Sequence, residues 1–499
     1  QLYWERFGLW YEEHRQYLHA IAAYEKSENY DALLRVIRSD AGILLASLKA
    51  EDVRKALDKC PAETLKAHPF AILVLMRRMF TWRQIPKMME LKELLMTAIE
   101  EHPEMPEEER GNLLGECDLI LSFLCYNDIG AMSRLHRSAS SQMSHSAISI
   151  QSSGGWTFGS PSVLMMFYRM PGDLAEMDEC MPHYYKVTSH HGQGAETIMR
   201  AEALFCQGDF TDAHIELERA YTQVKENGQI NMALCCDFLS RRLSLYVEVE
   251  QRYTFDERYA MLLRYHDASW INLWCATSAY YHALCGKIDK IPEVFLKHRL
   301  SDINMLAPGK PMMEMIENQV YLAEGAYAKV VGRSTQLLAV CETMHYVLVA
   351  LHIQIQTAAA YEKLGKLEEA RIWLKKALSD AEPDNLVMPF VENYDFLKPV
   401  LALEIRTDFI AQIIKLGEAA KRRRGENVRP AVFVTLTERE YELACLKVQR
   451  LSNREIAEKL FLSEGSVKQY VNQLYSKLHI EGDTQTKRKQ LAELLGQKN

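Results

Sequence analysis

The chain has 499 residues, of which 48% are hydrophobic and 25% charged, and its formal net charge is −8. These values are typical of a globular chain that is long enough for several domains. The sequence has no apolar run near the ~18 residues of a membrane helix and no visible signal peptide, which excludes a membrane or secreted protein at this stage. We therefore expect a cytoplasmic protein with no membrane partner.

Helical periodicity runs through most of the chain, and residues 1–40 contain its first example. The stretch WYEEHRQYLHAIAAYEKSENYDALLRVI, residues 10–37, resembles the helical hairpins that follow the nucleotidase module in MalT-like regulators, so we expect helical hairpins here.

Residues 41–414 show an internal period. Short turn signals recur about every 40 residues, at 127–129, 172–174, 208–210, 252–253, 286–288, 325–327 and 365–367, each between helical patterns. The unit AAAYEKLGKLEEARIWLKKAL, residues 358–378, resembles the tetratricopeptide consensus. This pattern predicts a stacked-hairpin solenoid in which each hairpin buries its apolar face only against its neighbours.

Two segments inside this region interrupt the helical pattern. Residues 138–162 are rich in serine and glycine and contain Trp156 and Phe158, which we interpret as exposed aromatic residues that could stack on an effector. The alternative is a disordered or capping insertion. Residues 180–194 contain His183, His190 and His191, but no carboxylate or cysteine at recognisable spacing completes a metal set, so we expect no metal.

Residues 415–430 are strongly basic and are interpreted as a linker. Arg422, Arg423 and Arg424 could be simply solvated, but their position before a helix-turn-helix pattern favours contacts with phosphates. The acidic remainder of the chain should avoid DNA.

Residues 431–499 carry the most specific pattern. Two Ser/Thr-x-x-Glu boxes predict helices at 437–448 and 452–460, Ser463 is expected to cap a third helix, and a fourth follows at 484–495. In the third helix, Val467, Val471, Leu474 and Leu478 form a narrow apolar stripe, and Lys468, Gln469, Asn472 and Ser476 lie on the opposite face. A short helix, a tight turn and a longer helix with a polar face predict a helix-turn-helix.

Residues 436–480 resemble the DNA-binding domain of LuxR-type transcription regulators, through Leu-Thr-x-Arg-Glu, Ser-Asn-x-Glu-Ile-Ala-x-x-Leu, Ser-Val-Lys and Lys-Leu in register. The resemblance implies that Lys468, Gln469 and Asn472 face base edges of double-stranded DNA. It further implies backbone contacts, which the following residues would make: Asn453, Arg454, Ser466 and Lys477. The chain departs from the family pattern at Arg450, Gly465, Tyr470 and Asp483, which indicates altered affinity or site preference.

The combination of a helical-repeat region, a basic linker and this terminus resembles the MalT-like class, the large ATP-binding LuxR-type regulators. The resemblance implies a cytoplasmic bacterial activator that senses a small-molecule effector through its repeats, contacts RNA polymerase and forms a homo-oligomer. No Gly-x-x-x-x-Gly-Lys-Ser/Thr loop occurs and the chain starts at Gln1, so we expect a fragment that lacks the class's nucleotidase module.

Two other functions were weighed against the regulator. A repeat scaffold for protein partners would use the terminal domain only for dimer contacts or weak DNA binding. An enzyme finds no support, because no nucleophile–base motif, phosphate loop or metal set is present, and no cofactor is expected in this fragment.

Overall fold

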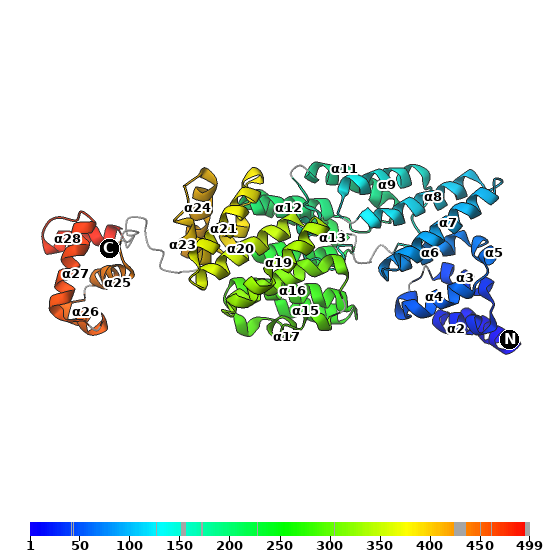
Figure 1. The fold of residues 1–499 in the computed structure, drawn as a ribbon, viewed down its shortest axis with the longest axis horizontal. Helices are drawn as coiled ribbons and strands as arrows, with labels where there is room; N and C mark the ends of the chain where they lie inside the picture. The colour runs from blue at the N-terminus through cyan, green and yellow to red at the C-terminus, as the bar shows by residue number, and fades with distance from the viewer. Residues whose placement is uncertain are drawn as a thin grey trace. The chain divides into compact units, whose positions relative to one another are not determined.

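The computed structural model describes residues 1–40, 42, 44–125, 127–150, 156–170, 173–226, 228–303, 305–423, 436–449, 451–460 and 462–494. Within these ranges every regular element is a helix (Figure 1), which confirms the predicted all-α class. The chain divides into two compact units, Gln1–Leu416 and Gly417–Asn499, and each has its own hydrophobic core. In the described ranges, no helix is long and apolar enough to cross a lipid bilayer.

The first part of the larger unit consists of short helices that pack as hairpins. Asn29 and Asp128 cap two of them, because each side-chain oxygen accepts a hydrogen bond from the amide three residues later, at 3.1 and 2.9 Å. The elements are α1 (Leu2–Glu13), α2 (Tyr17–Ser27), α3 (Tyr30–Ser39), η1 (Leu44–Ser47), α4 (Ala50–Lys59), α5 (Ala62–Lys66), α6 (Pro69–Thr81), α7 (Ile85–Glu101), α8 (Glu107–Ser122), η2 (Phe123–Cys125) and α9 (Ile129–Gln142).

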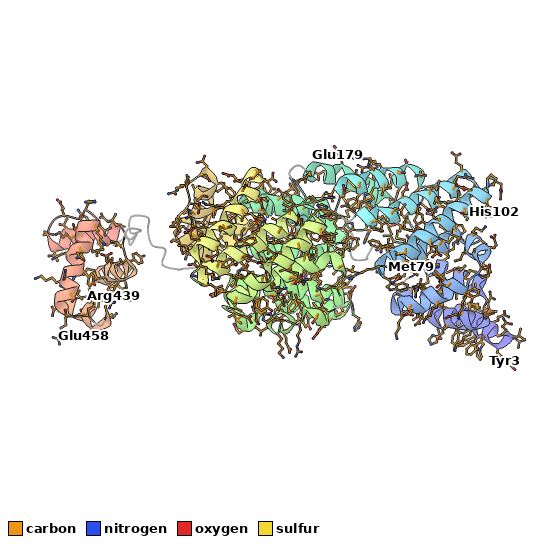
Figure 2. The ribbon with its side chains drawn as sticks, viewed as in Figure 1. Tyr3, Met79, His102, Glu179, Arg439 and Glu458 are labelled. Carbon is orange, nitrogen blue, oxygen red and sulfur yellow. The ribbon has the colours of Figure 1, made fainter. Side chains whose placement is uncertain are left out.

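Helix α1 differs from the others because large apolar side chains on it face solvent. Tyr3 is 79% exposed and Trp10 is 49% exposed, and Figure 2 shows Tyr3 near the N-terminus of this helix. In contrast, Met79 on α6 is fully buried.

The rest of the larger unit continues the succession of paired helices, and its last helix, α24, extends past Leu416 into the smaller unit. Its elements are α10 (Val163–Phe167), α11 (Asp173–Val187), α12 (Ala195–Gln207), α13 (Phe210–Glu226), α14 (Ile230–Leu243), α15 (Phe255–Leu263), α16 (Ala268–Leu284), η3 (Ile288–Lys290), α17 (Glu293–Leu296), η4 (Leu300–Asp302), η5 (Ala307–Gly309), α18 (Lys310–Ala323), α19 (Tyr327–Met344), α20 (Val347–Lys363), α21 (Leu367–Ala381), η6 (Glu382–Asp384), α22 (Met388–Glu392), α23 (Tyr394–Leu401) and α24 (Asp408–Arg423).

The predicted turns between repeats fall between helices wherever the structure describes them. Gly208 ends α12 with φ of 84°, and Gly365 follows α20 with φ of 72°, a backbone conformation that glycine adopts without steric cost. Gly172 lies outside the described residues. In the unit at 358–378, Ala370 and Ala377 are fully buried where α20 packs against α21, as the tetratricopeptide pattern predicts.

The expectation that hairpins contact only their neighbours is wrong. Helix α10 packs against α20, and α12 packs against α22, although these partners lie far apart in the sequence. A buried ion pair also joins helices that are far apart in the sequence. Arg242 Nε on α14 donates to Glu392 Oε1 on α22 at 2.7 Å, and the two side chains are 2% and 0% exposed. Tyr280 donates a further hydrogen bond to Glu392 at 2.9 Å. The apolar surface of one hairpin is thus buried partly against helices that follow much later.

The expected linker begins later than its composition suggests. Helix α24 extends to Arg423, and its Ile413 is fully buried while Leu416 packs on the core of the larger unit. The helical pattern therefore continues through the first part of the basic segment 415–430. Residues 424–430 lie outside the described ranges.

The smaller unit contains α25 (Glu438–Val448), α26 (Asn453–Leu460), α27 (Glu464–Lys477) and α28 (Thr484–Leu494). All four helices predicted from the sequence are present within a residue or so of the expected bounds. Their apolar side chains form one small core, to which α25, α26, α27 and α28 all contribute.

Candidate nucleic-acid interface

Local hydrogen bonds fix the starts of the helices that precede the recognition helix. Thr437 Oγ1 accepts from the amide of Glu440, and the amide of Thr437 donates to the Glu440 carboxylate at 2.8 Å. Ser452 and Glu455 form the same reciprocal pair before α26, with the Ser452 amide donating to Glu455 at 2.7 Å. Both predicted capping boxes are confirmed.

Arg439 ties the first helix to the end of the second. Its guanidinium donates to the carbonyl oxygen of Leu460, the last residue of α26, at 3.1 Å. Figure 2 labels Arg439 on α25 and Glu458 on α26. This contact satisfies a carbonyl that the end of a helix leaves without an intrahelical partner, and it fixes α26 against α25.

Helix α27 begins at the predicted cap, and its two faces have opposite character. Ser463 Oγ accepts from the amide of Ser466 at 3.1 Å. The apolar face is buried, with Val467 and Leu474 fully inaccessible to solvent. The polar face is exposed, and it carries the three predicted base-reading residues, Lys468, Gln469 and Asn472. Their side chains have no intramolecular hydrogen bond or ion pair with any residue that the structure describes.

The residues expected at phosphates have more varied environments. Arg454 is 80% exposed and pairs with Glu458 at 3.4 Å, so its guanidinium is free to exchange partners. Asn453 accepts a hydrogen bond from Lys447 at 2.6 Å. Ser466 shares a hydrogen bond of 2.8 Å with Ser463. Arg422 and Arg423 are exposed in the last turn of α24, whereas Arg424 lies outside the described residues.

Lys477 forms an ion pair within the DNA-binding domain, although its side chain is 44% exposed. Its ammonium group donates to both carboxylate oxygens of Glu440, at 2.7 and 2.9 Å, and the Glu440 side chain is 5% exposed. The hydrogen bond from Lys477 and those from Thr437 lower the pKa of the Glu440 carboxyl below its usual range. Lys477 therefore links the recognition helix to α25, in addition to any phosphate contact.

Comparison with known proteins supports the same assignment. Residues 434–489 match the family described as bacterial regulatory proteins, luxR family. These residues form a LuxR-type helix-turn-helix domain. The chain is also 38% identical over 80 residues to the transcriptional regulatory protein LnrK of Bacillus subtilis (strain 168). That match covers 16% of this chain and 36% of the relative's length. No solved structure matches the chain significantly.

Two departures from the LuxR-type pattern have structural roles. Asp483 is an acidic residue at a position where the family has an arginine. It accepts a hydrogen bond from the amide of Thr486 at 2.7 Å and so caps α28. Tyr470 is half-buried and packs against the core of the LuxR-type domain. A Cβ added at Gly465 would meet only Ser463 Oγ, at 3.8 Å, so no close contact requires glycine there. Arg450 lies outside the described residues.

The expectation that Trp156 is an exposed residue of an effector-binding loop is wrong. This side chain is 7% exposed, its ring lies 5.2 Å from that of Phe167, and a Cβ added at Gly192 would come within 2.3 Å of it. Trp156 is therefore a core residue, packed where only glycine fits. In addition, residues 138–142 are the end of α9 and not a loop.

Phe158 is half-buried and has φ of 51°, in the left-handed region. It lines a cavity of about 150 Å³ together with Phe80 and Leu306. The expected effector contact at this residue stays a prediction.

The histidines at 180–194 are not grouped for a metal. His191 is 3% exposed and its Nδ1 lies 2.7 Å from the hydroxyl of Tyr184. Across the part of the chain that the structure describes, no three His, Cys, Asp or Glu side chains lie close enough together to hold a metal ion.

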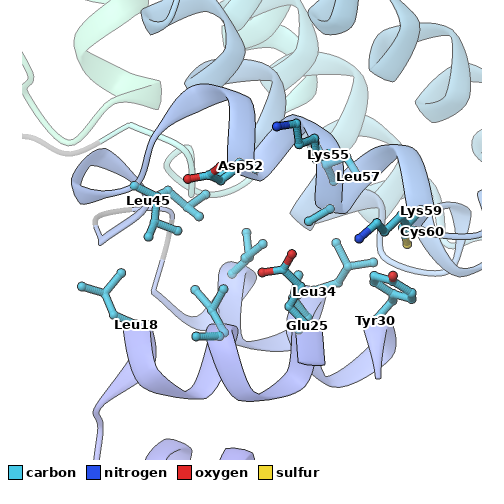
Figure 3. Close-up of a pocket in the computed structure, with 17 residues that line it drawn as sticks. Leu18, Glu25, Tyr30, Leu34, Leu45, Asp52, Lys55, Leu57, Lys59 and Cys60 are labelled. Carbon is cyan, nitrogen blue, oxygen red and sulfur yellow. The ribbon is translucent and has the colours of Figure 1, made fainter. Parts of the chain in front are cut away.

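The sequence did not point to the cavity between α2, α3 and α4, which has a volume of about 330 Å³. Figure 3 shows apolar side chains around it, with Leu18 from α2 and Leu57 from α4, and charged groups on Glu25, Asp52, Lys55 and Lys59. These charges balance approximately, so the cavity favours no particular ligand charge.

Proposed function

We propose that this protein is a bacterial transcription regulator that binds double-stranded DNA by inserting α27 into the major groove. The observation that carries the proposal is the exposed polar face of α27, whose other face is buried. Among the residues that the structure describes, Lys468, Gln469 and Asn472 on this face have no side-chain partner. Such side chains can form hydrogen bonds to base edges without first breaking intramolecular ones. The LuxR-type family match and the likeness to a transcriptional regulatory protein support it.

We further propose that the larger unit, Gln1–Leu416, senses a small-molecule effector in a MalT-like manner. The succession of paired helices supports this proposal, because such arrays offer extended binding surfaces. By the same resemblance, the protein would activate transcription through RNA polymerase and act as a homo-oligomer. The chain covers about a third of the length of the relative that it matches, so these roles come from resemblance.

The DNA-binding proposal is tested with the full chain. A preferred site is first selected from random duplex DNA, and binding to that site and to random duplex is then compared at several salt concentrations. Lys468→Ala and Asn472→Ala should each reduce discrimination between the two by ~1–3 kcal/mol, the value of one base contact. Lys489→Ala, an exposed lysine on α28, is the matched control for loss of charge.

The outcome distinguishes base-specific recognition of DNA from nonspecific electrostatic binding. If Lys468→Ala and Lys489→Ala weaken both DNAs equally, α27 does not read bases, and the assignment to the major groove fails. Failure to select any preferred site would favour the alternative, a repeat scaffold with weak DNA binding.

A further inference from the structure

The largest of the cavities described for the larger unit, about 580 Å³, lies between α18, α19 and the segment that precedes them. Its walls come from Glu314, Glu317 and Tyr321 on α18, from Lys329, Gly332 and Arg333 on α19, and from six residues that precede α18: His298, Leu300, Ser301, Ile303, Met305 and Ala307. Arg83, whose guanidinium donates to the carbonyl of Met305 at 3.4 Å, completes the rim. This volume suits a small organic molecule.

Gly332 keeps the cavity open. It lies inside α19, where glycine costs about 1 kcal/mol relative to alanine, yet its backbone shows no positive φ that would require glycine. A Cβ at this position would have no atom within 4 Å, so packing does not require glycine either. Gly332 lines the cavity, and the absence of its side chain leaves that space accessible.

Part of the charge in the cavity is already neutralised internally. Arg333 pairs with Glu317, whose side chain is 7% exposed. His298 stacks on Tyr321 with a centroid distance of 3.9 Å, and its Nε2 lies 3.0 Å from Glu324. The other nitrogen, Nδ1, is buried without a hydrogen-bond partner, 3.6 Å from Glu317 Oε1.

The charge that remains is positive. The Lys329 ammonium lies 5.0 Å from the ring centre of Tyr321 and forms no ion pair with any carboxylate in the described ranges. The Arg83 guanidinium donates to a backbone carbonyl and forms no ion pair within the described ranges. Lys310 lies 3.9 Å from Glu314, at the limit of an ion pair. Burial raises the pKa of the Glu314 carboxyl.

We propose that this cavity binds a small organic dianion, of the dicarboxylate or phosphate-ester class, held by Lys329 and Arg83. Lysine and arginine on separate elements fit two anionic groups of one ligand. The inference that this cavity is the effector site of the regulator rests on the proposed function. Binding itself is measured without DNA, so its failure is distinguishable from a failure of DNA recognition.

The test uses the full chain, with succinate, malate and glucose 6-phosphate as probes and glucose as the uncharged control. We expect at least one anion to raise the melting temperature in a saturable manner, because a ligand that binds only the folded state stabilises it. A response to succinate or malate alone assigns a dicarboxylate, and a response to glucose 6-phosphate alone assigns a phosphate ester.

Two substitutions locate the site. Lys329→Gln should weaken the responding anion at least tenfold, whereas Lys366→Gln, which removes the same charge from an exposed turn, should not. Gly332→Leu should abolish binding by filling the cavity while leaving the unliganded melting temperature equal or higher. The proposal is overturned if none of the three anions shifts melting, if Lys366→Gln acts like Lys329→Gln, or if Gly332→Leu binds normally.

Discussion

Lys477 and Arg454 were both expected at phosphates, yet the structure predicts opposite consequences for their loss. Lys477→Ala removes two hydrogen bonds to the Glu440 carboxylate, which is 5% exposed. Hydrogen bonds to charged groups contribute about 1.5–3 kcal/mol, and the Lys477 side chain is 44% exposed, so solvent screening reduces the expected cost to about 1–2 kcal/mol. Arg454→Ala should cost less than about 0.5 kcal/mol, since its pair with Glu458 is solvated.

Hydrogen exchange followed by mass spectrometry can resolve this difference in the full chain, because local opening free energies are read from peptides of α25 and α27. Lys477→Ala should lower protection in both helices, and Arg454→Ala should leave it unchanged. Lys477→Ala should also reduce the acid sensitivity of the domain. The Glu440 pKa is lowered in the folded state, so its stabilising effect is present above the unfolded pKa and is lost as pH falls through the folded value.

The same two substitutions give a DNA readout. If each residue contacts a phosphate, each loss should reduce the slope of log affinity against log salt by about 0.9. Unchanged exchange in α25 of Lys477→Ala would refute the structural role assigned to this lysine. An unchanged salt slope would refute its phosphate contact.

Three further outcomes are expected in the full chain. Burial raises the pKa of Glu202 to about 7, so its carboxyl destabilises the fold as pH rises from about 4.5 to about 7, by about 3 kcal/mol in total; Glu202→Gln should remove that slope in urea denaturation, and an identical slope would contradict it. Gly465→Ala should raise the unfolding free energy of the DNA-binding domain by up to about 1 kcal/mol, and a loss would mean that the first turn of α27 is not helical. Trp156→Ala should lower the unfolding free energy of the larger unit by about 3–5 kcal/mol, and an unchanged melting temperature would restore the exposed loop.

The sequence predicted best where the signals are local. Thr437 with Glu440, and Ser452 with Glu455, specify helix starts through contacts three residues apart, so the bounds of α25 and α26 could be read directly. The exposed position of Lys468 followed from helical geometry alone.

Burial and charge partners depend on residues far along the chain, and prediction failed there. Serine and glycine near Trp156 indicated backbone freedom, but Gly192 and Phe167 decide that the indole is buried. Likewise, the basic run after Lys415 concealed the apolar face of α24, on which Ile413 is fully buried. Nothing in the local pattern of Lys477 reveals that Glu440 is its partner.

The Arg242–Glu392 pair has a consequence for how the larger unit can be shortened. Arg242 lies within 5.6 Å of the ring centres of Phe205, Phe238 and Tyr280, and Glu392 is its carboxylate partner. A chain cut between α14 and α22 would leave a buried guanidinium without that carboxylate, at a cost of about 3–5 kcal/mol. Open repeat arrays often tolerate the deletion of terminal hairpins one at a time. Here the shortened chain should stop folding once the deletion removes Glu392. The helices from α14 to α22 should therefore unfold as one cooperative unit.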